Sequence, residues 1–586
     1  MVDKEDVTTS SADWTRTRIE DEMMFRTAEL GRTVDKAEYK QRVTALREDL
    51  VTVQNALRDA DFPVIVLFGG VDGAGKGDVV NALNEWMDPR WLLTRAFDEP
   101  SDEERERPEY WRFWRAFPPK GRIGLLLSAW YSRPLIERAY GGAEADFDRA
   151  LENIVGLEQQ LADDGACILK FWLHLSKEGQ EQRFRRLEKD PLQAWRVTER
   201  DWENWGRYDD FISAGERLIG RTSKGDAQWH IVEGFDSRYA SLSVGEMLLQ
   251  SIEIRLAERA SEPVEASQRP VDRVPEPESP EAPAARLHDE QPKILSLLDL
   301  SKQLSKADYR RLLPAYQGRL NELQKKARDR GVSTLIVFEG WDASGKGGAI
   351  RRINAALDSR AVRVIPVAAP TDEESAHHYL WRFWRHLSRA GQFTIFDRSW
   401  YGRVLVERVE GFATEKDWRR AYTEINQFEQ QMVDHGIVVL KFWMHIGNEE
   451  QLRRFEVRQQ TSYKRWKLTD EDWRNRERWP EYELAVHDMV ERTSTSGAPW
   501  RLVEGNDKRF ARVSVLRQTC EALAAALEEP VGVDESVGAE ASAEDGNGSK
   551  SGKGGRPGKG GRKGKNGKNP KRSAARPDKP GCKKSA

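Results

Sequence analysis

A glycine-rich stretch, GWDASGKGG at residues 340–348, has the residue types that bind phosphates. It follows a short apolar run, TLIVF at 334–338, and leads into a helical pattern at about 346–357. In such a turn, backbone N–H groups and the helix N-terminus converge on phosphate oxygens, and a lysine adds a mobile cation. The pattern therefore predicts phosphate contacts from Lys346 and from the loop residues Gly340, Ser344, Gly345 and Gly347. The alternative is an ordinary strand-to-helix turn without a ligand.

The loop departs from the usual phosphate-binding pattern at one position. Gly347 follows the lysine where Ser or Thr normally helps to hold Mg²⁺, and an acid, Asp342, lies inside the loop instead. We expect Asp342 to bind Mg²⁺ in place of the missing hydroxyl, or to steer or deprotonate a phosphate acceptor. Helix capping is the alternative role for this Asp.

A second acid, Asp397, ends the apolar run FTIF at 393–396 and is followed by Arg398. An acid at the end of a strand is a typical metal ligand in phosphoryl transfer, and an adjacent arginine can neutralise the transferred group. Asp342 and Asp397 are therefore the predicted Mg²⁺ ligands. A buried salt bridge is the alternative for Asp397 and Arg398.

A basic segment, residues 453–479, follows the run IVVLKFWM at 437–444. Arg454 and Arg458 are four residues apart and share a helix face. Lys464 and Lys467 follow. A basic helical segment at this point predicts a lid that brings cations to the phosphates and excludes water. A charged surface helix is the alternative.

The chain contains the same pattern twice. KAEY at 36 matches KADY at 306, and GVDGAGKGD at 70–78 matches the loop at 340–348. A period of about 270 residues indicates duplicated domains. Short apolar runs alternate with helical stretches, which predicts parallel sheets flanked by helices. We therefore predict an N-terminal domain at 1–260, a Pro/Glu/Ala-rich linker at 261–292, a C-terminal domain at 293–530 and a disordered Gly/Lys-rich tail at 531–586.

Composition narrows the class of protein. From Lys550 onward, fourteen Lys or Arg oppose one Asp, which leaves about −16 on the rest of a chain with net charge −3. The tail is either a solubilising segment or a polycation for polyphosphate or nucleic acid. Three cysteines give no disulfide framework. The N-terminus lacks a secretory signal and no apolar run is long enough for a bilayer, so we expect a cytoplasmic protein without membrane contact.

The two copies differ at the chemical positions. The N-terminal copy keeps Asp72 and Lys76, but Leu127 and Ser128 stand where the other copy has Asp397 and Arg398, and Leu187 replaces Arg458. Fold-determining stretches such as WRFW and KFW are present in both. Because leucine cannot bind a metal, we expect the C-terminal copy to catalyse and the N-terminal copy to be an inactive structural partner.

The sequence resembles the polyphosphate kinase 2 family over about 36–260 and 306–530. The matching motifs are GWDASGKGG, LWRFW, FDRSWYGRVLVERV, KFWMHI and KRWKLTDEDW. The tandem form is similar to the two-domain, AMP-phosphorylating members. The resemblance implies P-loop-kinase-like domains with a helical lid, and transfer of a phosphoryl group from inorganic polyphosphate to AMP, giving ADP, with Mg²⁺. It implies catalytic roles for Asp342, Lys346, Asp397, Arg398 and Arg458, and nucleotide contacts from Arg403 and Glu407.

Three alternatives remain open from the sequence. The same chemistry could act on nucleoside diphosphates, ATP could phosphorylate a small metabolite, or a non-catalytic protein could bind polyanions through its tail. A homo-oligomer is also possible. Nucleic acid is expected only at the basic tail.

Overall fold

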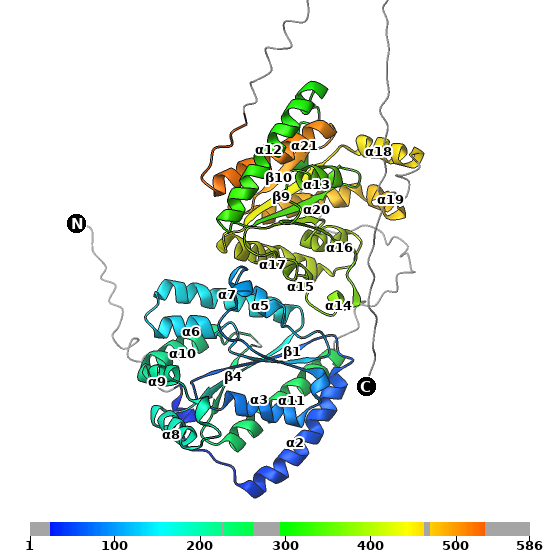
Figure 1. Cartoon of the computed structure of the whole chain (residues 1–586). Helices are drawn as coiled ribbons and strands as arrows, with labels where there is room; N and C mark the ends of the chain where they lie inside the picture. The colour runs from blue at the N-terminus through cyan, green and yellow to red at the C-terminus, as the bar shows by residue number, and fades with distance from the viewer. Residues whose placement is uncertain (1–23, 226, 262–293, 462–468, 534–586) are drawn as a thin grey trace, which may run out of the picture. The chain divides into compact units, whose positions relative to one another are not determined.

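The computed structural model describes residues 24–225, 227–261, 294–461 and 469–533. The predicted linker and tail, like Lys464 and Lys467, fall almost wholly outside these ranges. Each copy forms a parallel five-stranded sheet (Figure 1). The strands are β1 (Val64–Gly70), β2 (Leu92–Ala96), β3 (Ile123–Leu127), β4 (Cys167–His174), β5 (Trp229–Glu233), β6 (Thr334–Gly340), β7 (Val362–Pro366), β8 (Phe393–Asp397), β9 (Val438–His445) and β10 (Trp500–Glu504).

Both sheets have the same strand order. It is β2-β3-β1-β4-β5 in the N-terminal copy and β7-β8-β6-β9-β10 in the C-terminal copy. The strand before each glycine-rich loop is therefore central, and β8 lies beside β6 with Phe338 opposite Asp397. Ligands of such sheets bind beyond the carboxyl ends of the strands, where the chain order reverses. The two predicted acids, Asp342 and Asp397, lie at that edge of the sheet.

Helices cover both faces of each sheet. Those of the N-terminal copy are α2 (Lys36–Leu57), α3 (Lys76–Trp86), α4 (Asp102–Arg105), α5 (Trp111–Trp114), α6 (Ser132–Ala139), α7 (Glu144–Asp163), α8 (Lys177–Lys189), α9 (Glu199–Gly206), α10 (Tyr208–Thr222) and α11 (Ser237–Ser261). Those of the C-terminal copy are α12 (Lys306–Asp329), α13 (Lys346–Asn354), α14 (Asp372–Ser375), α15 (Trp381–Trp384), α16 (Val406–Val409), α17 (Glu415–Asp434), α18 (Asn448–Gln460), α19 (Asp470–Glu477), α20 (Trp479–Thr493) and α21 (Lys508–Ala526).

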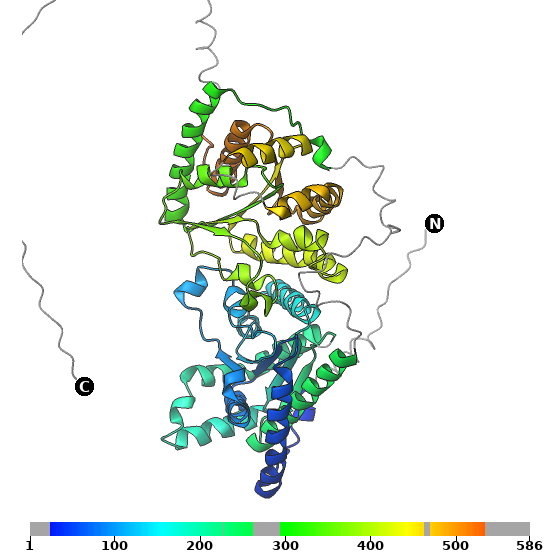
Figure 2. The ribbon, with the colours of Figure 1, turned by 90° about the vertical axis from the view of Figure 1, so that its right-hand side faces the viewer.

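In the C-terminal copy, α12, α13 and α21 pack on one face of the sheet, and α16, α17 and α20 cover the other (Figure 2). The inward side chains form two apolar cores, one on each face. Because both faces are covered, β6 is buried along almost its whole length and its sequence is a continuous apolar run rather than an alternating one. The predicted α/β architecture of two tandem domains is confirmed.

One predicted boundary was wrong. The sequence pattern extends the helix after the loop to residue 357, but α13 ends at Asn354. The amide of Ala356 donates to Ile353 O, an i→i−3 bond that tightens the last turn and ends the helix.

The two copies contact each other through equivalent segments, the WRFW helices α5 and α15. Trp114 and Trp384, which occupy the same position of the repeat, stack with ring centroids 5.8 Å apart. Contact between identical positions is the arrangement of a two-fold dimer. An ion pair of Arg389 with Glu106 at 2.5 Å also joins the two copies.

Candidate active site

The glycine-rich loop of the C-terminal copy turns between β6 and α13. Gly340 has φ 141°, and a Cβ there would lie 2.4 Å from Met444 O, so only glycine lets the chain pass β9. Gly345 has φ 117° and caps α13. Among the described residues, no protein acceptor faces the amides of Gly345, Lys346 and Gly347. Free N–H groups at a helix N-terminus are a site for a phosphate.

Lys346 lies folded back into this loop. Its ammonium donates to Gly340 O and, at 3.2 Å, to Trp341 O. Burial lowers the pKa of Lys346, and the nearby Asp342 carboxylate opposes that shift. A phosphate would give the ammonium a stronger partner than two carbonyl groups, so the side chain can move to a ligand without losing hydrogen bonds.

Asp342 joins the loop to the strand end and to the helical segment after β9. Its Oδ1 accepts from Arg398 Nη2 at 3.2 Å, and its Oδ2 accepts from Asn475 Nδ2 of α19 at 2.9 Å. The N-terminal copy keeps the second contact, from Asn204 to Asp72 at 2.8 Å, but has Ser128 in place of the arginine. The contact between α19 and the loop is therefore part of the shared fold, whereas the Arg398 contact belongs to one copy.

Asp397 and Arg398 lie where β8 ends. Among the described residues, no side chain donates to the Asp397 carboxylate, so its oxygens are available. Arg398 has φ 66°, a left-handed conformation that is unfavourable for a residue with a side chain, and its counterpart Ser128 has φ 52°. The backbone turn therefore survives in both copies, and it directs a guanidinium toward the loop in one of them.

The five side chains predicted to be catalytic line a single cavity of about 460 Å³. They are Asp342, Lys346, Asp397, Arg398 and Arg458. They come from the loop after β6, the start of α13, the end of β8 and α18, which are far apart in the sequence. Residues of α19, including Asn475, complete the wall. The predicted helical segment after β9 is thus in contact with the loop, although Lys464 and Lys467 lie outside the described residues.

These residues fit the predicted metal. The Asp397 carboxylate, which has no side-chain donor in the described part of the chain, and the Asp342 carboxylate are oxygen ligands of the kind that Mg²⁺ takes together with water and substrate phosphates. Within the described ranges, no group of three or more acidic, His or Cys side chains could hold a metal by itself. The pair therefore suits an ion that shares its coordination with phosphate, and the Mg²⁺ site stays a prediction.

The predicted phosphate contact of Arg454 stays a prediction, and the hydrogen bonds of this side chain go to the loop and its surroundings. It is only 3% exposed. Its guanidinium donates to the carbonyl oxygens of Ala343 at 2.9 Å and Gly505 at 2.6 Å, with further bonds to Ser344 O, Asn506 O and Glu450. With its donors directed at the backbone, we expect Arg454 to fix the shape of the loop rather than to contact phosphate. Ser344 is 2% exposed and its amide donates to Trp341 O at 3.0 Å, so its predicted phosphate contact would need that hydrogen bond to break.

A small basic cavity of about 250 Å³ adjoins the loop on the side of α13 and α21. Its cations are Arg453, Arg454, Arg458, Lys508 and Arg512. Arg458 lines both this cavity and the one around Lys346. Burial, followed by the neighbouring arginines, lowers the pKa of Lys508 to about 8. The clustered cations repel one another, which disfavours the charged form of Lys508. Such a cluster indicates a site for a polyanion, which would relieve the repulsion.

Sequence reasoning missed Lys508 and Arg512 because they lie on the last helix, far from any motif. A signal was available in the repeat. The N-terminal copy has Gln182, Leu187, Ser237 and Ser241 where the C-terminal copy has four of the five cations, and it keeps an arginine, Arg183, only at the position of Arg454.

Glu339 was also missed. It is 6% exposed, and its Oε1 accepts from Ser399 Oγ at 2.8 Å. Burial raises the pKa of Glu339, while Lys346 acts in the opposite sense. The N-terminal copy has Gly69 and Ala129 at these two positions, so the pair differs between the copies in the same way as Asp397 and Arg398.

A larger cavity, of about 1900 Å³, opens on the other side of Arg398. Its wall includes Tyr379, Arg382, Arg403 and Glu407. Arg403 Nε lies 2.9 Å from Glu407 Oε2, and its guanidinium lies over the Tyr379 ring at 4.4 Å. Both residues predicted to contact the nucleotide therefore lie together, across Arg398 from the basic cavity.

A phosphate loop after the central strand of a parallel sheet, with acids on adjacent strand ends and a helix over the loop, defines a P-loop-kinase-like phosphotransferase fold. The family model for polyphosphate kinase 2 matches residues 33–260 and 303–530. The chain belongs to the polyphosphate kinase 2 family, with one family unit in each copy.

The most informative relatives share the tandem arrangement. The chain is 50% identical over 510 residues to a polyphosphate:AMP phosphotransferase of Pseudomonas aeruginosa, covering 86% of this chain and all of the relative. It is 36% identical over 486 residues to a polyphosphate:AMP phosphotransferase of Acinetobacter johnsonii, covering 81% and 95%.

A crystal structure from Pseudomonas aeruginosa, described as a candidate polyphosphate kinase 2, matches with a TM-score of 0.75 and 47% identity. The match covers 86% of this chain and 100% of that chain. By contrast, an ADP-polyphosphate phosphotransferase of Rhizobium meliloti is 40% identical over 213 residues, covering 36% of this chain and 70% of the relative.

Proposed function

We propose that this protein transfers a phosphoryl group from inorganic polyphosphate to AMP and that the C-terminal copy performs the transfer. The observation that carries the proposal is the cavity shared by Asp342, Lys346, Asp397, Arg398 and Arg458, with a basic hollow on one side and the Arg403–Glu407 cavity on the other. AMP as the acceptor is supported by the names of the tandem relatives.

The reaction needs positioning and charge neutralisation more than covalent chemistry. An oxygen of the AMP phosphate attacks the terminal phosphorus of polyphosphate, and the bond from that phosphorus to the bridging oxygen breaks. The products are ADP and a chain one phosphate shorter. Lys346 and the loop amides would hold the donor phosphates, and Arg398 and Arg458 would neutralise the negative charge of the transferred phosphoryl group.

Asp342 and Asp397 would hold Mg²⁺, which when bound offsets phosphate charge. The Asp342 carboxylate is already fixed on both oxygens by Arg398 and Asn475, so its geometry is set before a substrate arrives. The α19 contact through Asn475 also brings a helix over the loop, which would limit the access of water as a competing acceptor.

We also propose a cytoplasmic location, because three cysteines in 586 residues give no disulfide framework of the kind that secreted proteins carry. Within the described ranges, none of the helices combines the length and the apolar character needed to cross a bilayer.

An acceptor panel tests the activity. Purified full-length protein is given polyphosphate and Mg²⁺ with AMP, GMP, ADP or GDP and no ATP, and products are separated by ion-exchange chromatography. We expect ADP from AMP to form fastest. Formation of triphosphates without ADP production from AMP would replace AMP by a diphosphate acceptor, and no product with any acceptor would overturn the proposal.

A further inference from the structure

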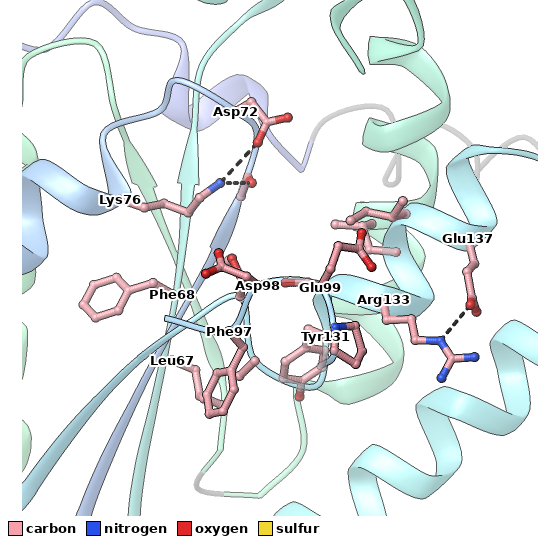
Figure 3. A pocket seen from close by; sticks show the side chains of 18 of the residues that line it. Leu67, Phe68, Asp72, Lys76, Phe97, Asp98, Glu99, Tyr131, Arg133 and Glu137 are labelled. Atoms are coloured by element: carbon pink, nitrogen blue, oxygen red, sulfur yellow. Dashed lines mark hydrogen bonds and ion pairs between the residues drawn. The ribbon is translucent and has the colours of Figure 1, made fainter. Parts of the chain in front are cut away.

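The N-terminal copy contains its own cavity of about 830 Å³ at the carboxyl end of its sheet. Figure 3 shows Lys76, Phe97, Asp98 and Glu99 around this hollow, with Arg133 and Glu137 on α6 at its rim. The volume lies within the range of small-molecule sites, about 300–1,000 Å³. About half of its lining residues, among them Phe97, Asp98, Arg133 and Glu137, occupy the same positions of the repeat as residues of the proposed acceptor cavity in the other copy.

The acceptor side of this copy keeps its polar framework. Arg112 donates to Asp98 O at 2.8 Å and lies 3.3 Å from Glu104, as Arg382 does to Ala368 O at 3.0 Å and to Glu374 at 3.3 Å. The rim pair is also retained. Arg133 Nε bonds Glu137 at 2.7 Å, at the positions of Arg403 and Glu407.

The donor side of the same copy is closed to a polyanion. Four of the five cations of the basic cavity have uncharged equivalents here, Gln182, Leu187, Ser237 and Ser241, and only Arg454 has a charged one, Arg183. Asp78 replaces Gly348 in the first turn after the loop, and Arg196 at 2.8 Å and Arg183 at 2.5 Å neutralise it. Asp78 and the two arginines paired with it therefore occupy the place where a polyphosphate chain would need cations without a protein partner.

The remaining chemistry suits a ligand with one phosphate. Among the described residues, no acceptor faces the amides of Gly75, Lys76 and Gly77, and Lys76 donates to Gly70 O at 2.6 Å and Val71 O at 3.0 Å in the same folded-back form as Lys346. The end of the cavity formed by the glycine-rich loop can therefore bind a phosphate.

The other end can take a base and a ribose. Phe97 replaces Val367, and its ring packs edge-on against Phe113 at 4.8 Å, which provides an aromatic surface for stacking. The Asp98 carboxylate has no donor among the described residues and can accept from ribose hydroxyl groups. Glu99 is bound by Arg200 of α9 at 3.2 Å, which ties that helix over the hollow.

We propose that the cavity of the N-terminal copy binds a nucleoside monophosphate and does not turn it over. Leu127 and Ser128 replace the second acid and its arginine, so the bound nucleotide meets only one of the two predicted metal ligands, Asp72, and no donor chain. The proposal rests on the proposed function, because that function identifies which cavity of the C-terminal copy receives the acceptor.

Binding stoichiometry tests the proposal. Full-length protein is titrated with AMP in isothermal calorimetry at about 150 mM salt, without polyphosphate, so that the basic tail is screened. We expect two AMP per chain for the wild type. Arg403→Met in the C-terminal copy should leave one, and adding Lys76→Met should weaken that remaining event at least tenfold.

A second variant keeps the test valid if a loop change disturbs folding. Phe97→Val installs the residue of the other copy, and in the Arg403→Met background it should weaken the remaining event about fivefold or more. One AMP per wild-type chain, lost entirely in Arg403→Met, would overturn the proposal. The two failures are distinguishable, because a wild type that binds AMP but makes no ADP from AMP and polyphosphate contradicts the proposed function instead.

Discussion

Arg398 Nη2 lies 3.2 Å from Asp342 Oδ1 and joins the end of β8 to the glycine-rich loop after β6. The contact needs the left-handed backbone at Arg398, φ 66°, which the equivalent Ser128 shares without using it. A guanidinium in this position offers donors to the loop acid and to a phosphoryl group together. Its loss from one copy is the clearest difference between two otherwise similar phosphate loops.

Arg398→Lys should lower kcat about 100-fold, because a lysine cannot contact the acid and the transferred group with a planar set of donors. Steady-state ADP production from AMP measures this. Ser128→Ala at the matching position should change kcat by less than about twofold. An Arg398→Lys enzyme with normal kcat would remove the residue from the reaction.

Gly348→Asp would give the C-terminal copy the acid that the N-terminal copy has at Asp78. A Cβ at Gly348 lies 3.5 Å from the flexible Arg512 side chain, so the fold should tolerate the change. We expect KM for polyphosphate to rise at least tenfold, because the introduced carboxylate would pair with cations of the basic cavity, with KM for AMP little changed. The reciprocal Asp78→Gly should leave both KM values unaltered, and equal effects on both substrates would contradict a separate donor site.

Much of the site could be predicted because adjacent parallel strands have their carboxyl ends at the same edge of the sheet. Asp342 and Asp397 each follow an apolar run, so any parallel sheet with adjacent runs brings them together. The role of Arg454 was not accessible in this way, because its partners are backbone carbonyl groups such as Gly505 O, which no side-chain pattern reveals. Lys508 and Arg512 were missed because helix α21 returns to the loop from more than 150 residues along the chain.

Polyphosphate binding should depend on pH through Lys508. Its pKa is about 8 in the free protein. A bound polyanion favours the ammonium form and raises this pKa, so binding takes up a proton when the pH lies above the free value. KM for polyphosphate should therefore rise as pH increases above about 8 and stay level below it. Lys508→Arg should flatten that rise, since arginine stays charged; an unchanged profile would exclude Lys508 as the source.

Glu339→Gln tests a positioning role beneath the loop. The buried carboxylate accepts from Ser399 at 2.8 Å and faces Lys346, so it would hold the strand end and the lysine in register. We expect kcat to fall about tenfold with both KM values nearly constant, and Ser399→Ala to give a smaller fall. A loss of thermal stability with normal kcat would show that the pair is structural.

Matched loop variants test most directly the claim that one copy catalyses. Asp342→Asn and Asp72→Asn change the same position of the repeat in an isosteric way, and both proteins can be compared by kcat for ADP formation from AMP and polyphosphate. We expect kcat to fall at least about 100-fold in Asp342→Asn and less than about twofold in Asp72→Asn. Equal losses in the two variants, or full activity in Asp342→Asn, would contradict that claim.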